Sequence, residues 1–195
     1  KRKTKELRLD NQVQFKLIDY RNVKGEFDRI VSVGAFEHFG KKFYNTFFKS
    51  MNRLLKSDGI FLLHTIGSVE SPTPGNRFIN KHIFPGGVVP SFSDIINPIQ
   101  NTGLIVADTE TLIRHYDKTL ESWLKRFMDN KNLVKDLFDE KFVKMWEFYL
   151  ASCSAAFKYR DLVVFQYQLV KNFDAIPSNR RDYIYSWWVS AINKI

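Results

Sequence analysis

Two short apolar runs flank an amphipathic segment in the first third of the chain, and this arrangement constrains the fold more than any other feature. The runs cover residues 27–33 and 60–65. Between them, apolar side chains recur at helical spacing: Tyr44, Phe47, Phe48, Met51, Leu54 and Leu55. The sequence at residues 57–59, Ser-Asp-Gly, is expected to stop this helix. Strand, helix and strand in this order predict a parallel crossover unit, with the run at 27–33 buried on both faces of the sheet. The fold class is therefore α/β.

Other elements extend this unit in both directions. Alternating apolar and polar residues predict a strand over residues 13–17, with Asp19 and Tyr20 at its end, and another over residues 163–169 at the edge of the sheet. A further strand is expected over residues 104–111. Helical spacing predicts two later amphipathic helices: residues 120–127 and 142–157. A short helix is expected from Ser91, and Pro98 must end or kink it. Prolines and glycines predict loops over residues 67–75 and 84–87.

The size and composition of the chain fit one globular unit. It has 195 residues, of which 44% are hydrophobic, enough to fill a single core. Its 18 Phe, eight Tyr and four Trp exceed what a minimal core needs. Such rings commonly line large apolar pockets, although most of them are expected to pack in an aromatic-rich core.

The net charge of +9 favours an anionic partner, which leaves nucleic acid, an acidic protein or an anionic lipid surface. Basic residues are spread along the chain apart from a short cluster within residues 1–5. Because the sequence has no long basic arm or finger motif, a nucleic-acid partner is disfavoured and a membrane surface stays open. The aromatic tail offers an interfacial patch at Tyr183, Trp187 and Trp188, or packs on its own domain.

Cys153 is the single cysteine, so the sequence predicts neither an internal disulfide nor a multi-cysteine metal site. A reducing compartment, the cytoplasm, is expected. No apolar stretch is long enough to span a bilayer, and the first residues lack the apolar segment of a secretory signal. We therefore expect peripheral contact with the inner face of the membrane. The first residue is not Met, which favours further sequence upstream.

Candidate chemical residues follow the predicted strands, because ligands of open parallel sheets lie beyond the carboxyl ends of the strands. Asp19 and Tyr20 form a pair that can accept an adenine amino hydrogen and pack on the base, although a turn is the usual role of such an Asp. Glu37 and His64 are more specific, because together they could hold a polar ligand or move protons. The plainer alternatives are a helix-terminal Glu and a core His. No Gly-rich phosphate fingerprint occurs, so either no nucleotide binds or the first strand and loop lie upstream.

Several stretches of the chain resemble the cyclopropane-fatty-acid synthases and the related mycolic acid cyclopropane synthases. The segment Phe27–Gly40, which reads FDRIVSVGAFEHFG, carries the resemblance most strongly. Further similar stretches cover nearly the whole chain: residues 59–67, 78–87, 115–120, 149–150, 156–161, 175–177 and 181–184.

The resemblance implies a class I S-adenosylmethionine (SAM)-dependent methyltransferase fold. Residues 1–195 would then form one partial catalytic domain, with helical insertions within residues 68–160 that cover a lipid pocket. The implied activity is transfer of a methylene group from SAM to the double bond of an unsaturated phospholipid acyl chain at the membrane surface, with a homodimer as a further possibility. Members carry a Gly-rich SAM loop with a Cys after the first strand, and this sequence has neither. The alternatives are therefore an inactive lipid-binding remnant and a relative that methylates lipid without closing the ring.

The resemblance also implies roles for individual residues. The residues that match a bicarbonate-binding set are Glu37, His64, the backbone of Ile66, and Tyr116. The residues that match the cofactor side are Asp19, Tyr20, Gly34 and Phe36. The candidates for lining an acyl channel are Phe36, Tyr116, Trp146, Tyr149 and Cys153. No metal site is expected.

Overall fold

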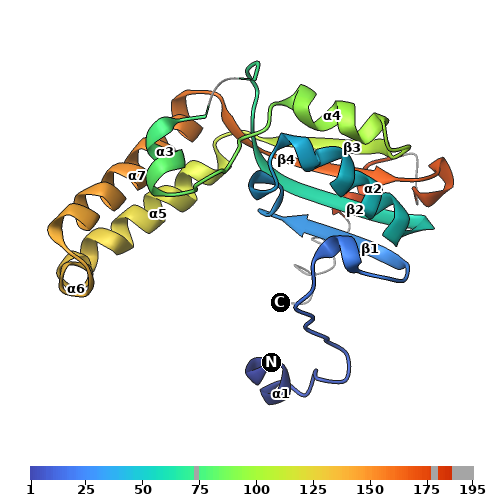
Figure 1. Ribbon diagram of the computed structural model, residues 1–195, viewed down its shortest axis with the longest axis horizontal. Coiled ribbons are helices and arrows are strands. Elements are labelled where there is room, and N and C mark those ends of the chain that lie inside the picture. The colour runs from blue at the N-terminus through green and yellow to red at the C-terminus, as the bar shows by residue number, and fades with distance from the viewer. Residues whose placement is uncertain (73–74, 177–179, 186–195) are drawn as a thin grey trace.

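A four-stranded mixed sheet forms the body of the protein in a computed structural model that describes residues 1–72, 75–176 and 180–185 (Figure 1). Its strand order is β1-β2-β4-β3. The bounds of the strands are β1 Phe27–Val33, β2 Leu55–Ser68, β3 Ile105–Leu112 and β4 Leu162–Val170. β1 and β2 are parallel, whereas β4 is antiparallel to both β2 and β3. The predicted parallel crossover between the first two strands is confirmed.

Helix α2 (Tyr44–Leu54) makes this crossover, and its apolar stripe faces the sheet. The helix ends earlier than predicted, because Leu55 already has an extended backbone and begins β2. The pairing of β2 with β1 shifts register between Phe27 and Arg29, which accommodates the extra residues around Gly59. The Ser-Asp-Gly sequence therefore marks an irregular section of the strand instead of the helix end.

The prediction that β1 is buried on both faces is wrong. Val31 and Val33 expose 62% and 63% of their surface. β1 pairs with β2 along one edge, and no strand among the described residues pairs along the other. An apolar run shows that its side chains favour a strand, but it does not show how many strands or helices pack against that strand.

The two terminal strand predictions also need correction. Residues 163–169 do form a strand, β4, but it lies inside the sheet between β2 and β3. The strand at this edge of the sheet is therefore β3. Residues 13–17 are not a strand, and Leu17 is fully exposed. In the described part of the chain this segment has no neighbouring strand, and an extended segment without ladder hydrogen bonds gains little from its β-propensity.

One face of the sheet is covered by α2 and by α4 (Phe92–Gln100), as Figure 1 shows. We call the apolar cluster between these elements the sheet cluster: Phe36, Tyr44, Phe47, Phe48, Met51, Leu54, Leu55, Phe61, Leu63, Ile95, Ile99, Leu104, Val163, Phe165, Tyr167 and Leu169. Ser91 caps α4 in a capping box with Asp94, as its position predicted. The helix continues two residues past Pro98, so the proline removes one intrahelical hydrogen bond without ending the helix.

A helical arm projects from one end of the sheet (Figure 1). It comprises α3 Arg77–His82, α5 His115–Asp129, α6 Lys131–Leu137 and α7 Glu140–Tyr159. The two predicted amphipathic helices correspond to α5 and α7, whereas α3 and α6 were missed because each is too short to show a period. We call the buried side chains of this region the arm cluster: Leu120, Tyr149, Leu150, Phe157 and Val164.

The remaining described elements are short. They are α1 Arg2–Glu6, η1 Tyr20–Asn22, η2 Phe36–His38, η3 Lys41–Phe43 and η4 Phe173–Ala175. Within the described residues, no helix is both long and apolar enough to cross a membrane. Trp187 and Trp188, two of the three residues of the predicted interfacial patch, lie outside the described residues.

Candidate functional site

The carboxyl ends of β1 and β2 are joined by hydrogen bonds that fix the position of Glu37. Gly34, directly after β1, donates its N–H to the carbonyl of His64 at 3.0 Å. Glu37 lies in the short helix η2, and its Oε1 accepts the N–H of Ile66 at 2.6 Å. The carbonyl of Glu37 accepts the N–H of Val88 at 2.9 Å. Three segments far apart in sequence therefore hold this carboxylate at the rim of the sheet.

The second carboxylate oxygen of Glu37, Oε2, is buried and has no hydrogen-bond partner among the described residues. Leaving a buried acceptor unsatisfied costs about 1–3 kcal/mol, and more for a charged group. An oxygen in this position is suited to accept a hydrogen from a bound ligand or water. This unpartnered atom is the strongest local indication of a binding site.

Tyr116 lies at the start of α5, half-buried against Phe157 at a ring separation of 5.0 Å. Burial raises the pKa of Tyr116, and the negative charge of Glu37 raises it further. The phenol therefore stays protonated at neutral pH and can donate a hydrogen bond. Because the charge of Glu37 acts on it, Tyr116 shares the electrostatic environment of the carboxylate although 79 residues separate them in sequence.

His64 lies on β2 two residues before Ile66, so the side chains of His64 and Ile66 are on the same face of the sheet. Its Nδ1 is 3.0 Å from the amide Nε2 of Gln166 on β4. An amide nitrogen only donates, so in this arrangement Nδ1 accepts and Nε2 is the ring nitrogen left to donate. Gln166 thus makes Nε2 the hydrogen-bond donor that His64 can offer to a ligand.

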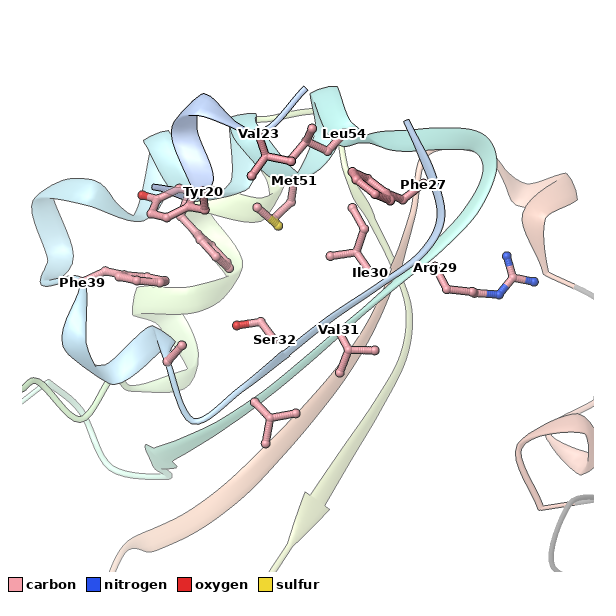
Figure 2. Close-up of a pocket in the computed structure, with 13 residues that line it drawn as sticks. Tyr20, Val23, Phe27, Arg29, Ile30, Val31, Ser32, Phe39, Met51 and Leu54 are labelled. Carbon is pink, nitrogen blue, oxygen red and sulfur yellow. The ribbon is translucent and has the colours of Figure 1, made fainter. Parts of the chain in front are cut away.

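An apolar groove of about 480 Å³ lies between β1 and α2, beside the predicted cofactor residues (Figure 2). Tyr20 and Phe39 line one end of it, and Val33 and Ala35, the neighbours of Gly34, also contribute. Gly34 has a φ of +61°, which a residue with a side chain rarely adopts. The structure therefore brings Tyr20 and the Gly34 turn together at one concave surface.

Asp19 does not line this groove. Its carboxylate binds the guanidinium of Arg21, with Arg21 Nη2 at 2.6 Å from Oδ2 and Arg21 Nε at 2.9 Å from Oδ1. This pairing lowers the pKa of Asp19 to about 2. In this arrangement Asp19 caps η1 and is already occupied, so a role in adenine binding would require Arg21 to release it.

The side chain of Phe36 lies in the sheet cluster, wholly buried and stacked on Tyr44 at 4.1 Å. As placed, it cannot line an acyl channel, and only its backbone lies beside the Gly34 turn. Trp146, Tyr149 and Cys153 lie together on α7 in or against the arm cluster, as does Tyr116 on α5. Four of the five predicted channel residues therefore share one apolar region.

Three polar features around the site were not predicted from the sequence. Gln166 was seen only as the polar member of an alternating strand. Tyr44 was assigned to the apolar face of a helix, yet its hydroxyl is buried without a partner and is influenced by the charges of Asp94 and Glu37. Ser68 donates its hydroxyl to Asp161 at 2.6 Å, which ties the end of β2 to the residue before β4. A Tyr in a helix face otherwise rich in Phe was the only available signal.

The sequence profile of the mycolic acid cyclopropane synthetase family matches residues 1–167. The chain belongs to this family. It is 42% identical over 150 residues to the cyclopropane-fatty-acyl-phospholipid synthase of Escherichia coli K12, an alignment that covers 77% of this chain and 39% of the relative. It is 36% identical over 167 residues to the tuberculostearic acid methyltransferase UfaA1 of Mycobacterium tuberculosis, covering 83% and 39%. The chain therefore spans well under half the length of these two relatives.

Solved structures agree with the family assignment. The mycolic acid cyclopropane synthase CmaA1, crystallised with SAH and CTAB, superposes with a TM-score of 0.72 at 34% identity, covering 79% of this chain and 59% of CmaA1. Coclaurine N-methyltransferase, at 23% identity and a TM-score of 0.72, shares the fold. The predicted SAM-dependent methyltransferase fold is thus confirmed. Among the described residues, no group of His, Cys, Asp and Glu is arranged to hold a metal ion.

Proposed function

We propose that this chain is the catalytic part of an enzyme that uses SAM to add a methylene bridge across the double bond of a phospholipid acyl chain. The observation that carries the proposal is the buried, unpartnered Oε2 of Glu37, held beside the Ile66 amide and acting electrostatically on Tyr116. The 42% identity with the Escherichia coli phospholipid synthase supports this substrate class. The enzyme would work in the cytoplasm at the periphery of the membrane.

The groove between β1 and α2 fits the adenosyl part of SAM in chemical character. Its apolar lining and the ring of Tyr20 offer a stacking surface, and Ser32 adds one hydroxyl. When bound, SAM supplies an electrophilic methyl group. The residues of this chain that would hold it are Tyr20 and the backbone of the Gly34 turn, which lies at the carboxyl end of β1.

A bicarbonate ion fits the donors and acceptor around Glu37, and when bound it would supply a base. His64 Nε2 and the Tyr116 hydroxyl can donate hydrogen bonds to the anionic oxygens, while Glu37 Oε2 can accept the hydrogen of the bicarbonate hydroxyl. Gln166 and the Ile66 amide orient His64 and Glu37, respectively. The role of the chain is thus to position a proton acceptor at a fixed place.

The arm cluster provides the apolar surroundings that this chemistry requires. Tyr116, Trp146, Tyr149 and Phe157 present rings near the site and exclude water from it. The faces of these rings attract positive charge, which develops on an alkene carbon as the double bond attacks an electrophile. A site with polar groups at one end and aromatic rings around the rest suits a lipid substrate better than it suits a polar substrate.

The test uses the protein extended by any upstream coding sequence of its gene, incubated with SAM and unsaturated phosphatidylethanolamine or phosphatidylglycerol. We expect a cyclopropane acyl chain, identified by mass spectrometry and by proton NMR, where ring methylene protons are distinct from those of a methyl branch. Absence of any modified lipid, in a protein that binds SAM by calorimetry, would reject the proposal. A control without added bicarbonate, in carbonate-depleted buffer, should slow the reaction.

A second candidate is a lipid methyltransferase that leaves a methyl branch. It is supported by the 36% identity with the tuberculostearic acid methyltransferase UfaA1. The same NMR experiment decides, because a methyl branch gives no ring protons. A third candidate, a lipid-binding protein without activity, is rejected if residues 1–195 alone bind SAM in calorimetry.

A further inference from the structure

The far end of the helical arm exposes a compact set of large apolar side chains. Leu133, Leu137 and Phe138, which we call the arm tip, expose 59%, 70% and 63% of their surface. Leu133 and Leu137 are four residues apart in α6 and therefore lie on one face of that helix, and Phe138 follows directly. In Figure 1, α6 is the part of the arm farthest from the sheet.

A row of aromatic rings leads from the arm tip toward the candidate site. The ring of Phe138 stacks on Phe142 at 4.2 Å, and Phe142 stacks on Trp146 at 5.7 Å. Trp146 in turn contacts Tyr149 at 5.1 Å. We call Phe138, Phe142, Trp146 and Tyr149 the ring stripe. Phe142, Trp146 and Tyr149 lie on one side of the first turns of α7, and Phe138 directly precedes Asp139, the N-cap of this helix.

Exposure falls along the ring stripe in one direction. Phe138 is mostly exposed, Phe142 and Trp146 are half-buried, and Tyr149 is buried at 7%. Tyr149 is a buried member of the arm cluster, and Tyr116 packs against the same cluster, so the stripe ends in the apolar region that adjoins the candidate site. The three ring-to-ring separations of the stripe together span at most about 15 Å. That length is close to the half-thickness of a bilayer hydrocarbon core, about 15 Å.

The arm tip also carries an excess of positive charge. Residues 125–144 contain six basic side chains, Lys125, Arg126, Lys131, Lys135, Lys141 and Lys144, and four acidic ones, Asp129, Asp136, Asp139 and Glu140. Two of the basic side chains are paired, Lys135 with Glu140 and Lys131 with Glu147. Apolar side chains on a segment with a net positive charge suit the boundary between acyl chains and anionic headgroups. A second copy of this chain, itself carrying +9, would meet repulsion at the same surface.

We propose that the arm tip is the surface by which this protein contacts an anionic phospholipid bilayer, and that the ring stripe receives an acyl chain there and leads it toward Glu37. The inference rests on the proposed function for its substrate. It adds the place of entry and names Leu133, Leu137, Phe138 and Phe142 as residues that contact lipid. Burying the tip side chains in the acyl region provides the apolar part of the binding free energy, and the basic residues provide the electrostatic part.

The test measures co-sedimentation of the full chain with vesicles of equal parts phosphatidylglycerol and phosphatidylcholine. The test variant is Leu137→Glu with Phe138→Glu, and the matched control is Phe173→Glu, whose ring is 79% exposed in η4 next to the sheet. We expect the double variant to bind at least about tenfold more weakly, because each tip side chain loses its transfer into lipid. The control should change binding by no more than about twofold.

A second variant guards against an indirect effect. Phe138→Ala adds no charge and should weaken binding several-fold, with the circular dichroism spectrum unchanged. Lipids brominated in mid-chain should quench tryptophan fluorescence, and Trp146→Phe should remove part of this quenching. Quenching unaltered by Trp146→Phe would exclude the ring stripe as the acyl path.

Three outcomes would overturn the proposal. Equal vesicle binding by the double variant and the control would show that the tip does not contact lipid. Loss of a dimer in the double variant without vesicles, measured by light scattering, would assign the tip to a second copy. If the protein binds pure phosphatidylcholine vesicles as strongly as the mixed vesicles, the proposed preference for anionic lipid is wrong. Since binding is measured without turnover, tip-dependent binding with no modified lipid would reject only the proposed function.

Discussion

The sheet cluster and the arm cluster are built from similar side chains but differ in how completely they are closed. The sheet cluster has sixteen buried members and six half-buried neighbours, whereas the arm cluster has five buried members and eleven half-buried neighbours. The first is a mostly closed core that stabilises the fold, and it opens where Phe47, Met51 and Leu54 line the groove beside β1. The second leaves many apolar surfaces partly open, as a region that accepts a ligand must. Aromatic content alone therefore does not distinguish a core from a pocket.

Glu37 lies at the border of the two clusters, so its replacement gives the largest expected effect on activity. Glu37→Gln keeps the shape but removes the charge, and we expect turnover of the extended protein to fall about 10²–10⁴-fold. Glu26→Gln, at an exposed position before the other end of β1, is the matched control and should leave turnover unchanged. Wild-type rates in Glu37→Gln would remove this residue from the site.

The difference in closure predicts unequal costs of the same substitution in the two clusters. Phe61→Ala, at a wholly buried position, should lower the free energy of unfolding by about 3–5 kcal/mol. Phe127→Ala, at a half-buried position packed against the arm cluster, should cost less than half as much. Urea unfolding followed by circular dichroism measures both. Equal costs would mean that the arm cluster is as tightly packed as the sheet cluster.

Cys153 reports the apolar character of the arm cluster through its reactivity. Burial raises the pKa of its thiol to about 11. Only the thiolate reacts with iodoacetamide, so at pH 8 alkylation of the folded chain should be roughly a hundredfold slower than that of the urea-unfolded chain. The rate should keep rising with pH up to the raised pKa. A folded-state rate that levels off near pH 9 would show that the thiol faces water.

The smallest expected effect concerns hydroxyls inside the sheet cluster. The hydroxyls of Tyr44 and Tyr167 are buried without a partner in the described residues. Removing an unsatisfied polar atom is neutral or slightly stabilising, so Tyr44→Phe and Tyr167→Phe should each change the free energy of unfolding by less than about 1 kcal/mol. A loss above about 2 kcal/mol would reveal a bound water or ion at that hydroxyl.

The sequence predicted the local elements of the sheet body well, because each has a strong period. The stripe of α2 and the alternation of β4 follow directly from their apolar positions. Their neighbours could not be predicted in the same way, since alternation says which face is buried and not which strand lies alongside. The segment at residues 13–17 shows this limit, because its alternation is clear but no described strand pairs with it.

The candidate site was partly visible for a related reason. Glu37 and His64 stand at the ends of apolar strands, where ligands of such sheets bind, so their position could be inferred from the pattern. Tyr116 came only from the family resemblance, because its approach to Glu37 depends on tertiary structure. Gln166 and the free oxygen of Glu37 could not be found at all, since a hydrogen-bond partner across the sheet leaves no mark in the sequence.

The attachment of the arm to the sheet has a consequence for how such proteins diversify. β3 and β4 are hydrogen-bonded neighbours, with Leu112 opposite Val164, and α5, α6 and α7 form a single excursion between them. Lengthening, shortening or redecorating that excursion requires no change in strand pairing. Under the proposed function, the part that would select an acyl chain can therefore evolve separately from the rim that carries Glu37 and His64, so that one reaction would be available to lipids of different shapes.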